Sequence, residues 1–555
     1  MLPSILSFAD PEDGDFDSHD EISTPSETTP LVSNSADGIT PATRHWESPP
    51  GFYWIETAIF SNVFLSGFDG TITASTYAVI GSEFNAANTV SWLTTSYLIT
   101  STAFQPLYGR FSDILGRRTC FFIATLTFLL GCLGCALAPD IIALNIMRAL
   151  TGLGGGGLMT MATIINSDMI PFRERGMYQA CQNVLHGFGS ICGASLGGLI
   201  ADHIGWRWCF LSQVPISIFA FVVGYLVISK HELKLVAGEE NSGSAKKACK
   251  WEQIDLIGAI LLVLGLSAQL AAMSMGGNLY PWDDIRVIIA MVSSIILLIV
   301  FVLVELWTKA IPVLPMAMLK GTLAMSNQIS NICVGMAAYS FLFMIPLFFQ
   351  VVLQDSPSEA GMRLVIPSLA TPVGGVISGI IMSRWGGLNE LVRAGCFFMM
   401  IGNGAVASLK FEDSHWKYLF YLFPANFGQG MCYPAILFTF LAAFDHSQQA
   451  VSTSLVYLFR SMGTVWGVAA SSTLLQDVLT QRLLSSLAGV PGKECLIDEI
   501  RHSITMLKTL PPDMQSIARH GYYEALRYVF VANTAVTAVA LVASFFAQGK
   551  GLRRN

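Results

Sequence analysis

Charge is scarce in this sequence. Asp, Glu, Lys and Arg make up 12% of its 555 residues, whereas about a quarter of the residues in ordinary soluble domains are charged. The hydrophobic fraction is 53%, and the charges cluster in short segments between long apolar runs. This pattern excludes a soluble globular protein and indicates a polytopic membrane protein. The formal net charge of −7 comes largely from the N-terminal residues, so it gives no reason to expect a nucleic-acid partner.

Several other signals are missing. Residues 1–50 contain no apolar core long enough for a cleavable signal peptide, and the chain contains no Asn-x-Ser/Thr sequon. The glycine run "GLGGGG" follows no strand, and the loops contain no nucleophile–base or metal-ligand spacing. We therefore expect a protein that is not an enzyme and has neither cofactor nor metal. Most of the eleven cysteines lie in apolar runs and are predicted to be packing residues rather than disulfide partners: Cys120, Cys132, Cys135, Cys181, Cys192, Cys209, Cys333, Cys396 and Cys432.

The apolar runs predict an all-α membrane protein with fourteen transmembrane helices. Each run has about 20 residues, enough to cross a bilayer as a helix. Residues 1–50 are rich in Ser, Thr, Pro and acidic residues and are predicted to form a disordered cytosolic tail. The predicted spans are 52–79, 89–109, 118–138, 141–165, 178–201, 208–229, 254–274, 287–308, 328–352, 362–383, 391–409, 416–441, 450–474 and 525–547.

Basic residues predict the orientation of these spans. With the N-terminus in the cytosol, the predicted cytosolic loops contain most of the Lys and Arg residues. The opposite short loops contain only Arg207, Arg286, Arg363, Lys410 and Lys417. This asymmetry predicts that both termini, including 548–555, are cytosolic and that a loop over 478–523, partly helical, faces the other side.

The chain also contains a weak internal repeat. "GRFSDILGRR" closes the second span and "GIIMSRWGG" closes the tenth, so that Gly109-x-x-x-Asp113 is echoed by Gly379-x-x-x-Ser383. The echo predicts a six-helix bundle over 51–230 and a second over 321–547. Residues 231–320 would then supply a cytosolic loop and an inserted helix pair. Two six-helix halves with an insert are typical of a transporter.

The segment "GRFSDILGRR" is the most specific local pattern. Gly109 and Gly116 suit close helix packing and chain reversal, and Asp113 can cap a helix or pair with an arginine. Arg117 and Arg118 would hold the loop at an anionic membrane face; the alternative is a generic basic loop. The pattern resembles the conformational motif of the major facilitator superfamily, and this resemblance implies the major facilitator fold and a loop that stabilises one alternating-access state.

Further stretches extend the resemblance. "RALTGLGGGG" is similar to the fourth-helix motif of proton-coupled antiporters, and "WRWCFLSQVP" and "FFQVVLQDSPSEAGMRLVIP" are similar to the fourteen-helix drug:proton antiporter branch. "GSICGASLGG" resembles the fifth-helix antiporter motif with Ala194 in place of a frequent proline, and its glycines are Gly189, Gly193, Gly197 and Gly198. "YAVIGSEF" and the Gln213 of "SQVP" also resemble the fungal vacuolar basic amino-acid transporters. Membership of that group implies movement of His, Lys and Arg into the vacuole in exchange for protons.

An aspartate stands where a bilayer-spanning helix should be apolar. Asp69 lies about 26 Å along the first span, and Arg148 lies about 10 Å into the fourth, which runs the opposite way. Both therefore reach the outer half of a core about 30 Å thick, where pairing would reduce the burial cost of each. We predict that they pair and bind protons or substrate. The alternative is that Asp69 caps a helix broken at "GFDGT".

Other polar residues in the spans are weaker candidates. Asn183 and His186, with Gln182, are placed to meet a cationic substrate, and Arg460 lies too deep for a surface charge. Arg460 either lines the central cavity or holds helices together. Glu56 is expected to snorkel at the cytosolic mouth. The loop-locking charges are predicted to be Asp168, Arg173 and Arg175.

The tail contains an approximate acidic dileucine signal made of Glu27, Leu31 and Val32. Together with the resemblance, it favours the vacuolar membrane and a sorting adaptor as partner, with the plasma membrane as the alternative. The expected protein is a monomer in contact with lipid, protons and a small-molecule substrate. Two functional alternatives remain: a plasma-membrane multidrug or siderophore efflux antiporter, and a nutrient sensor that does not transport.

Overall fold

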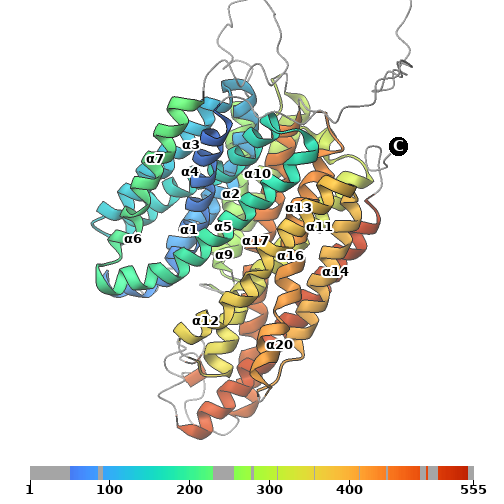
Figure 1. Ribbon diagram of the computed structural model, residues 1–555. Helices are drawn as coiled ribbons and strands as arrows, with labels where there is room; N and C mark the ends of the chain where they lie inside the picture. Colours follow the sequence, from blue (N-terminus) through green and yellow to red (C-terminus); the bar gives the residue numbers. More distant parts are fainter. Residues whose placement is uncertain are drawn as a thin grey trace, which may run out of the picture. The chain divides into compact units, whose positions relative to one another are not determined.

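The computed structural model describes residues 51–84, 92–228, 255–276, 280–308, 310–355, 357–411, 413–445, 448–487, 496–497, 500 and 511–547. The predicted tail over 1–50, its sorting residues Glu27, Leu31 and Val32, and the C-terminus over 548–555 lie outside these residues. The described part is a bundle of helices (Figure 1) in which the single β-bridge joins Gly276 and Tyr280. The all-helical prediction is therefore confirmed.

The first group of helices ends at Val227. It comprises α1 (Phe52–Glu83), α2 (Trp92–Leu115), α3 (Arg117–Leu137), α4 (Ile141–Met169), α5 (Phe172–His203), α6 (Arg207–Leu211) and α7 (Gln213–Val227). Within it, α1 packs on α5, and α4 packs on both α2 and α3.

The second group follows a helix pair, α9 (Leu256–Met275) and α10 (Ile285–Trp307), and a short helix η2 (Met316–Leu319). It comprises α11 (Thr322–Leu347), η3 (Phe348–Val352), α12 (Pro357–Ser368), α13 (Ala370–Trp385), α14 (Leu388–Ala407), α15 (His415–Phe420), α16 (Phe423–Leu441), α17 (Gln449–Ser486) and α20 (Pro512–Phe545). Here α14 packs on α16 and α20, and α11 packs on α17. The predicted long loop over 478–523 is thus helical at both ends.

Local sequence explains where several helices begin and turn. The carboxylates of Asp140 and Asp255 accept hydrogen bonds from the backbone N–H of Ala143 and Gly258, at 2.7 and 2.8 Å, and so cap α4 and α9. Gly116 joins α2 to α3 with φ +95°, a conformation that side chains rarely adopt. The chain reversal predicted for this glycine is confirmed.

Many of these helices are suited to a membrane. Nine segments of the described chain are long and apolar enough to cross one: 117–137, 141–169, 174–201, 207–227, 256–275, 285–307, 322–352, 363–385 and 512–545. Each overlaps a predicted span, although the segment 512–545 begins inside the predicted loop 478–523. Five further predicted spans coincide with α1, α2, α14, α16 and α17, whose sequences are less apolar, so the count of fourteen stays a prediction.

The cysteines behave as their apolar surroundings predict. All nine cysteines named from the sequence are free thiols, and Cys120, Cys132, Cys135, Cys209, Cys396 and Cys432 are buried between helices. Their sulfur atoms fill small spaces where helices cross, which is the usual role of a buried free cysteine.

Candidate functional site

The centre of the first group holds a buried ion pair between α1 and α4. Arg148 Nη1 donates to both carboxylate oxygens of Asp69 at 2.8 Å, and each side chain is 0% exposed. Arg148 Nε also donates to the carbonyl of Leu93 at 3.2 Å, and its guanidinium lies 4.5 Å from the centre of the Tyr97 ring. Asp69 and Arg148, which are predicted to pair from their depths in the spans, therefore do meet in the structure.

Gln213 on α7 completes this site. Its amide Nε2 donates to Asp69 Oδ1 at 3.2 Å, and the glutamine is fully buried. From the sequence, Gln213 carried only a resemblance to the vacuolar transporters, and its contact with the carboxylate was not predicted. A lone glutamine at the start of the apolar stretch that forms α7 was the signal that pointed to a buried polar partner.

The helix around Asp69 is continuous. Residues Phe52–Glu83 form one uninterrupted α-helix, so the alternative in which Asp69 caps a break at "GFDGT" is wrong. Gly67, two residues before Asp69, is needed for helix packing instead. A Cβ added at Gly67 would lie 2.1 Å from the carbonyl oxygen of His186 on α5. Gly67 therefore allows α1 and α5 to touch backbone to backbone, which needs no unwinding of α1.

The glycines of the α5 motif serve the same crossing. A Cβ added at Gly189 or Gly193 would lie 2.3 Å from the carbonyl oxygen of Phe64 or Phe68 on α1. The carbonyl of Gly197 accepts a hydrogen bond from the Cys209 thiol at 3.4 Å. Gly198 has open space around its Cα and takes no part in the contact. The motif thus fixes the distance between α1, which carries Asp69, and α5.

At one end of the bundle, here called the motif end, lies the segment 109–118. Arg117 donates to Asp113 at 2.6 Å and to Asp168 at the end of α4 at 2.7 Å. Burial raises the pKa of the Asp113 carboxyl, and the guanidinium of Arg117 opposes that rise. Arg118 instead lies 5.3 Å from the Tyr225 ring centre on α7. Arg117 therefore ties the α2–α3 turn to α4, whereas Arg118 packs toward α7.

Replacing Arg117 with Ala is expected to reduce transport about tenfold, the effect of losing about 1.4 kcal/mol. The change removes both ion pairs of Arg117 and leaves Asp113 with only the longer contact to Arg110, at 3.9 Å. Arg118→Ala, which breaks no ion pair in the described chain, is the matched control. Initial uptake rates in membrane vesicles measure both variants. Equal rates for the two variants would contradict a specific role for Arg117.

Two glycines related by the repeat bring the two groups of helices together at the motif end. A Cβ added at Gly109 on α2 would lie 2.0 Å from the Ser454 hydroxyl on α17. A Cβ added at Gly379 on α13 would lie 2.7 Å from the carbonyl oxygen of Gly176 on α5. We call these two contacts the glycine seam. The motif end is closed along this seam in the structure.

Side chains reinforce the closed motif end. Arg175 on α5 donates to Gln449 at the start of α17 at 2.8 Å. Arg110 on α2 donates to the carbonyl of Pro312, in the segment after α10, at 2.7 Å. Arg175 thus has the loop-locking contact predicted for it, while the side chain of Arg173 lies outside the described residues.

Arg460 occupies the middle of α17. Its guanidinium lies 4.2 Å from the ring centre of Tyr433 and donates to the Tyr433 carbonyl at 3.0 Å. A longer hydrogen bond of 3.4 Å reaches Asn331 on α11. His186 lies on α5, where its carbonyl accepts a hydrogen bond from the Ser190 hydroxyl at 3.0 Å. Asn183 lies on the same helix, where its side chain is 3.9 Å from the position of a Cβ at Gly375.

Glu56 does not snorkel. The side chain is 4% exposed and lies against α4, where Asn166 Nδ2 donates to one carboxylate oxygen at 3.4 Å. The second oxygen has no hydrogen-bond partner among the residues that the structure describes. Its helical position turns it toward α4 rather than toward the surface, so the sequence-based prediction is wrong.

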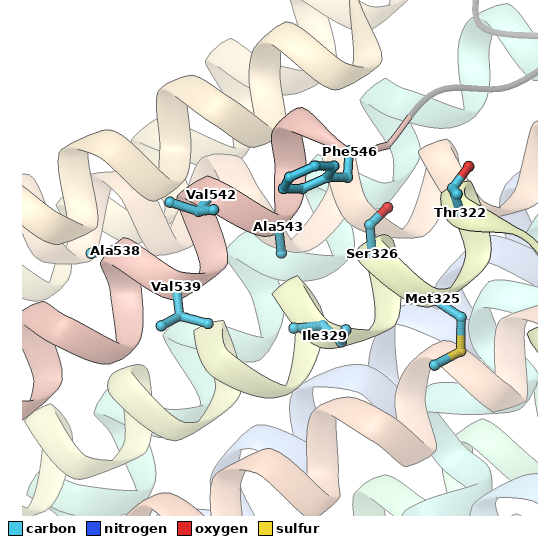
Figure 2. A pocket seen from close by; sticks show the side chains of 9 residues that line it. All are labelled: Thr322, Met325, Ser326, Ile329, Ala538, Val539, Val542, Ala543 and Phe546. Carbon is cyan, nitrogen blue, oxygen red and sulfur yellow. The ribbon is translucent and has the colours of Figure 1, made fainter.

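A groove in the described part lies elsewhere, between α11 and α20. Side chains of α11 and α20 face a groove of about 590 Å³ (Figure 2), lined by Thr322, Met325, Ser326, Ile329, Ala538, Val539, Val542, Ala543 and Phe546. The lining contains no charged residue, and half-exposed apolar side chains such as Met325 and Val539 border it. This chemistry does not suit a cationic solute.

Comparison with known proteins gives consistent matches. Residues 59–468 match the family described as Major Facilitator Superfamily. Vacuolar basic amino acid transporter 2 of Saccharomyces cerevisiae is 42% identical, over 81% of this chain and 96% of its own length. Multidrug resistance protein fnx1 of Schizosaccharomyces pombe is 37% identical, over 88% and 90% of the two chains. The solved structure of the human organic anion transporter MFSD10 aligns with a TM-score of 0.57 at 12% identity, covering 90% of this chain and 100% of that one, so the two share a fold.

Proposed function

The chain belongs to the Major Facilitator Superfamily, and from that premise we propose that it moves Lys, His and Arg from the cytosol into the vacuole in exchange for protons. The observation that carries the proposal is the 42% identity to a protein named as a vacuolar basic amino acid transporter, over almost all of that protein's length. The buried Asp69–Arg148 pair supplies a group that can couple transport to protons.

In this proposal the Asp69–Arg148 pair couples transport to protons because Asp69 exchanges Arg148 for a proton. While Arg148 touches Asp69, the carboxylate is matched by a cation and stays charged. If the helices move and the guanidinium withdraws, an isolated carboxylate in an apolar interior is far less stable than a neutral acid. Asp69 then takes up a proton, and the return of Arg148 releases it. Gln213 stays as a hydrogen-bond partner of Asp69 in either state.

The finer architecture is part of the proposal. Fourteen helices would cross the membrane, as in the drug:proton antiporter branch, with the motif end and both termini in the cytosol. The coincidence of all fourteen predicted spans with helices supports this count, and the distribution of Lys and Arg supports the orientation. With the glycine seam closed, the structure would then represent the state whose cytosolic entrance is shut.

Uptake into vacuolar vesicles tests the function. Vesicles from cells that express the chain are expected to accumulate labelled Lys, His and Arg in an ATP-dependent manner, and vesicles from cells without it are not. An uncoupler is expected to abolish the difference, because the proton gradient supplies the driving force. Equal uptake by the two preparations would remove the basic amino acids as substrates.

A second candidate function is drug efflux at the plasma membrane. The 37% identity to a protein named as a multidrug resistance protein favours it. Drug sensitivity after deletion of the gene, together with a tagged protein at the cell surface, would support efflux over vacuolar storage.

A further inference from the structure

Arg460 lies on the side of α17 that faces the first group of helices. The Tyr457 hydroxyl, one turn before it, hydrogen-bonds to the Thr163 hydroxyl of α4 at 2.8 Å. The Ser461 hydroxyl, next in the chain, donates to Gln105 of α2 at 2.9 Å. The two neighbours therefore fix Arg460 at the boundary between the two groups, where major facilitator proteins change shape.

The Arg460 guanidinium is held in place by two aromatic rings, and it can still donate further hydrogen bonds. The Tyr433 and Tyr457 rings lie 4.2 and 5.2 Å from its central carbon and orient its plane. Within the described chain, Arg460 donates hydrogen bonds to two acceptors, the Tyr433 carbonyl and Asn331. A guanidinium has five N–H donors, so it can donate further hydrogen bonds. The residue is partly exposed rather than sealed. It is thus oriented to receive a further acceptor.

The positive charge of Arg460 is also not balanced by a carboxylate of the described residues. No carboxylate of the described residues forms an ion pair with Arg460, whereas Arg148 is matched by Asp69. A cation at the middle of a membrane-spanning helix costs about 2.5–3.5 kcal/mol on insertion scales, and such residues usually serve ligands or pathways. An anionic group of the transported molecule would supply the missing charge.

We propose that Arg460 binds the α-carboxylate of the amino-acid substrate. This rests on the proposed function, because it assigns one end of a Lys, His or Arg molecule to a specific residue. A planar guanidinium pairs with a carboxylate through two parallel hydrogen bonds, which a carboxamide cannot reproduce. The Arg460 guanidinium therefore distinguishes amino acids from amines of similar length, and Arg460 is a substrate-binding residue rather than a proton carrier.

Binding of three matched ligands tests this assignment. Purified full-length protein in lipid nanodiscs is titrated with L-lysine, L-lysinamide and cadaverine at about pH 6, where α-amino groups are charged. Wild type is expected to bind lysine at least about tenfold more tightly than either analogue, as a charge-assisted hydrogen bond predicts. Arg460→Gln is expected to bind all three with similar affinity, and Arg460→Lys to recover part of the preference for lysine.

A matched control separates the carboxylate from general packing. Arg519 on α20 donates to the carbonyl of Val352 at 2.6 Å and lies 5.5 Å from the Phe411 ring, an environment like that of Arg460 but outside the boundary. Arg519→Gln is expected to keep the wild-type preference. Continued binding of cadaverine by Arg460→Gln shows that this variant is folded.

The outcomes distinguish the two proposals. If Arg460→Gln keeps the preference for lysine, or if wild type binds lysinamide as tightly as lysine, the assignment of Arg460 is overturned while a basic substrate stands. If wild type binds none of the three and the vesicles show no uptake, the proposed function fails, and the assignment fails with it. Loss of all binding in Arg460→Gln, with an unchanged melting temperature, also contradicts a role limited to the carboxylate.

Discussion

Proton-driven exchange by the Asp69→Asn variant is expected to fall at least about 100-fold. The asparagine cannot change charge, and it leaves Arg148 as an uncompensated cation in a site that is 0% exposed. Breaking a buried pair by removing one partner typically costs about 3–5 kcal/mol, or two to three orders of magnitude in an equilibrium. The measurement is the initial rate of lysine uptake into proteoliposomes driven by an imposed pH gradient.

Two further variants define the cause. Asp477→Asn changes an exposed aspartate of α17 and is expected to keep the wild-type rate. The double variant Asp69→Asn with Arg148→Gln removes both charges, so its melting temperature should recover toward wild type while exchange stays absent. Full-speed exchange by Asp69→Asn would show that another group carries the proton.

Replacing Gly109 with Val is expected to prevent closure of the motif end and to reduce transport more than about tenfold. Even a single added carbon would lie 2.0 Å from the Ser454 hydroxyl and 2.8 Å from the Ala450 carbonyl, well inside contact distance. Overpacking of this kind typically costs about 1–3 kcal/mol, and here it destabilises only the state in which the motif end is closed. Spin labels on α2 and α17 at the motif end should report a longer distance in the variant than in wild type.

The control for this variant is Gly198→Val, at a glycine of α5 with open space around it. It adds the same side chain at a position of α5 that takes no part in the seam, and should leave the distance unchanged. Adding Ser454→Gly to Gly109→Val removes the nearer obstacle and should recover part of the transport. An unchanged distance in Gly109→Val would mean that the seam tolerates a side chain and does not control closure.

Several features of this site follow from sequence because they depend on local geometry. The depth of Asp69 and Arg148 requires only helix rise and direction, and their pairing is present at 2.8 Å. Gly116 was predicted from the need for a reversal, and it has a positive φ. The buried thiols follow from the hydropathy of the runs that contain them.

Other features depend on how distant helices align, which single-sequence patterns do not report. The exposure of Glu56 was predicted wrongly because it depends on which face of α1 meets α4. The seam partner of Gly109 lies on α17, more than three hundred residues along the chain, and the register between these helices is set by packing of both groups. The contact of Gln213 with Asp69 likewise needs the position of α7 against α1.

The helix pair α9 and α10 contributes to an apolar core that contains residues of both groups of helices. Leu262 and Leu266 of α9 belong to the same apolar core as Leu107 of α2 and Leu455 of α17, and Pro312 accepts the hydrogen bond of Arg110. Excision of this pair would expose apolar side chains of α2 and α17 together. A chain that lacked this pair would therefore need compensating substitutions in both groups of helices at once.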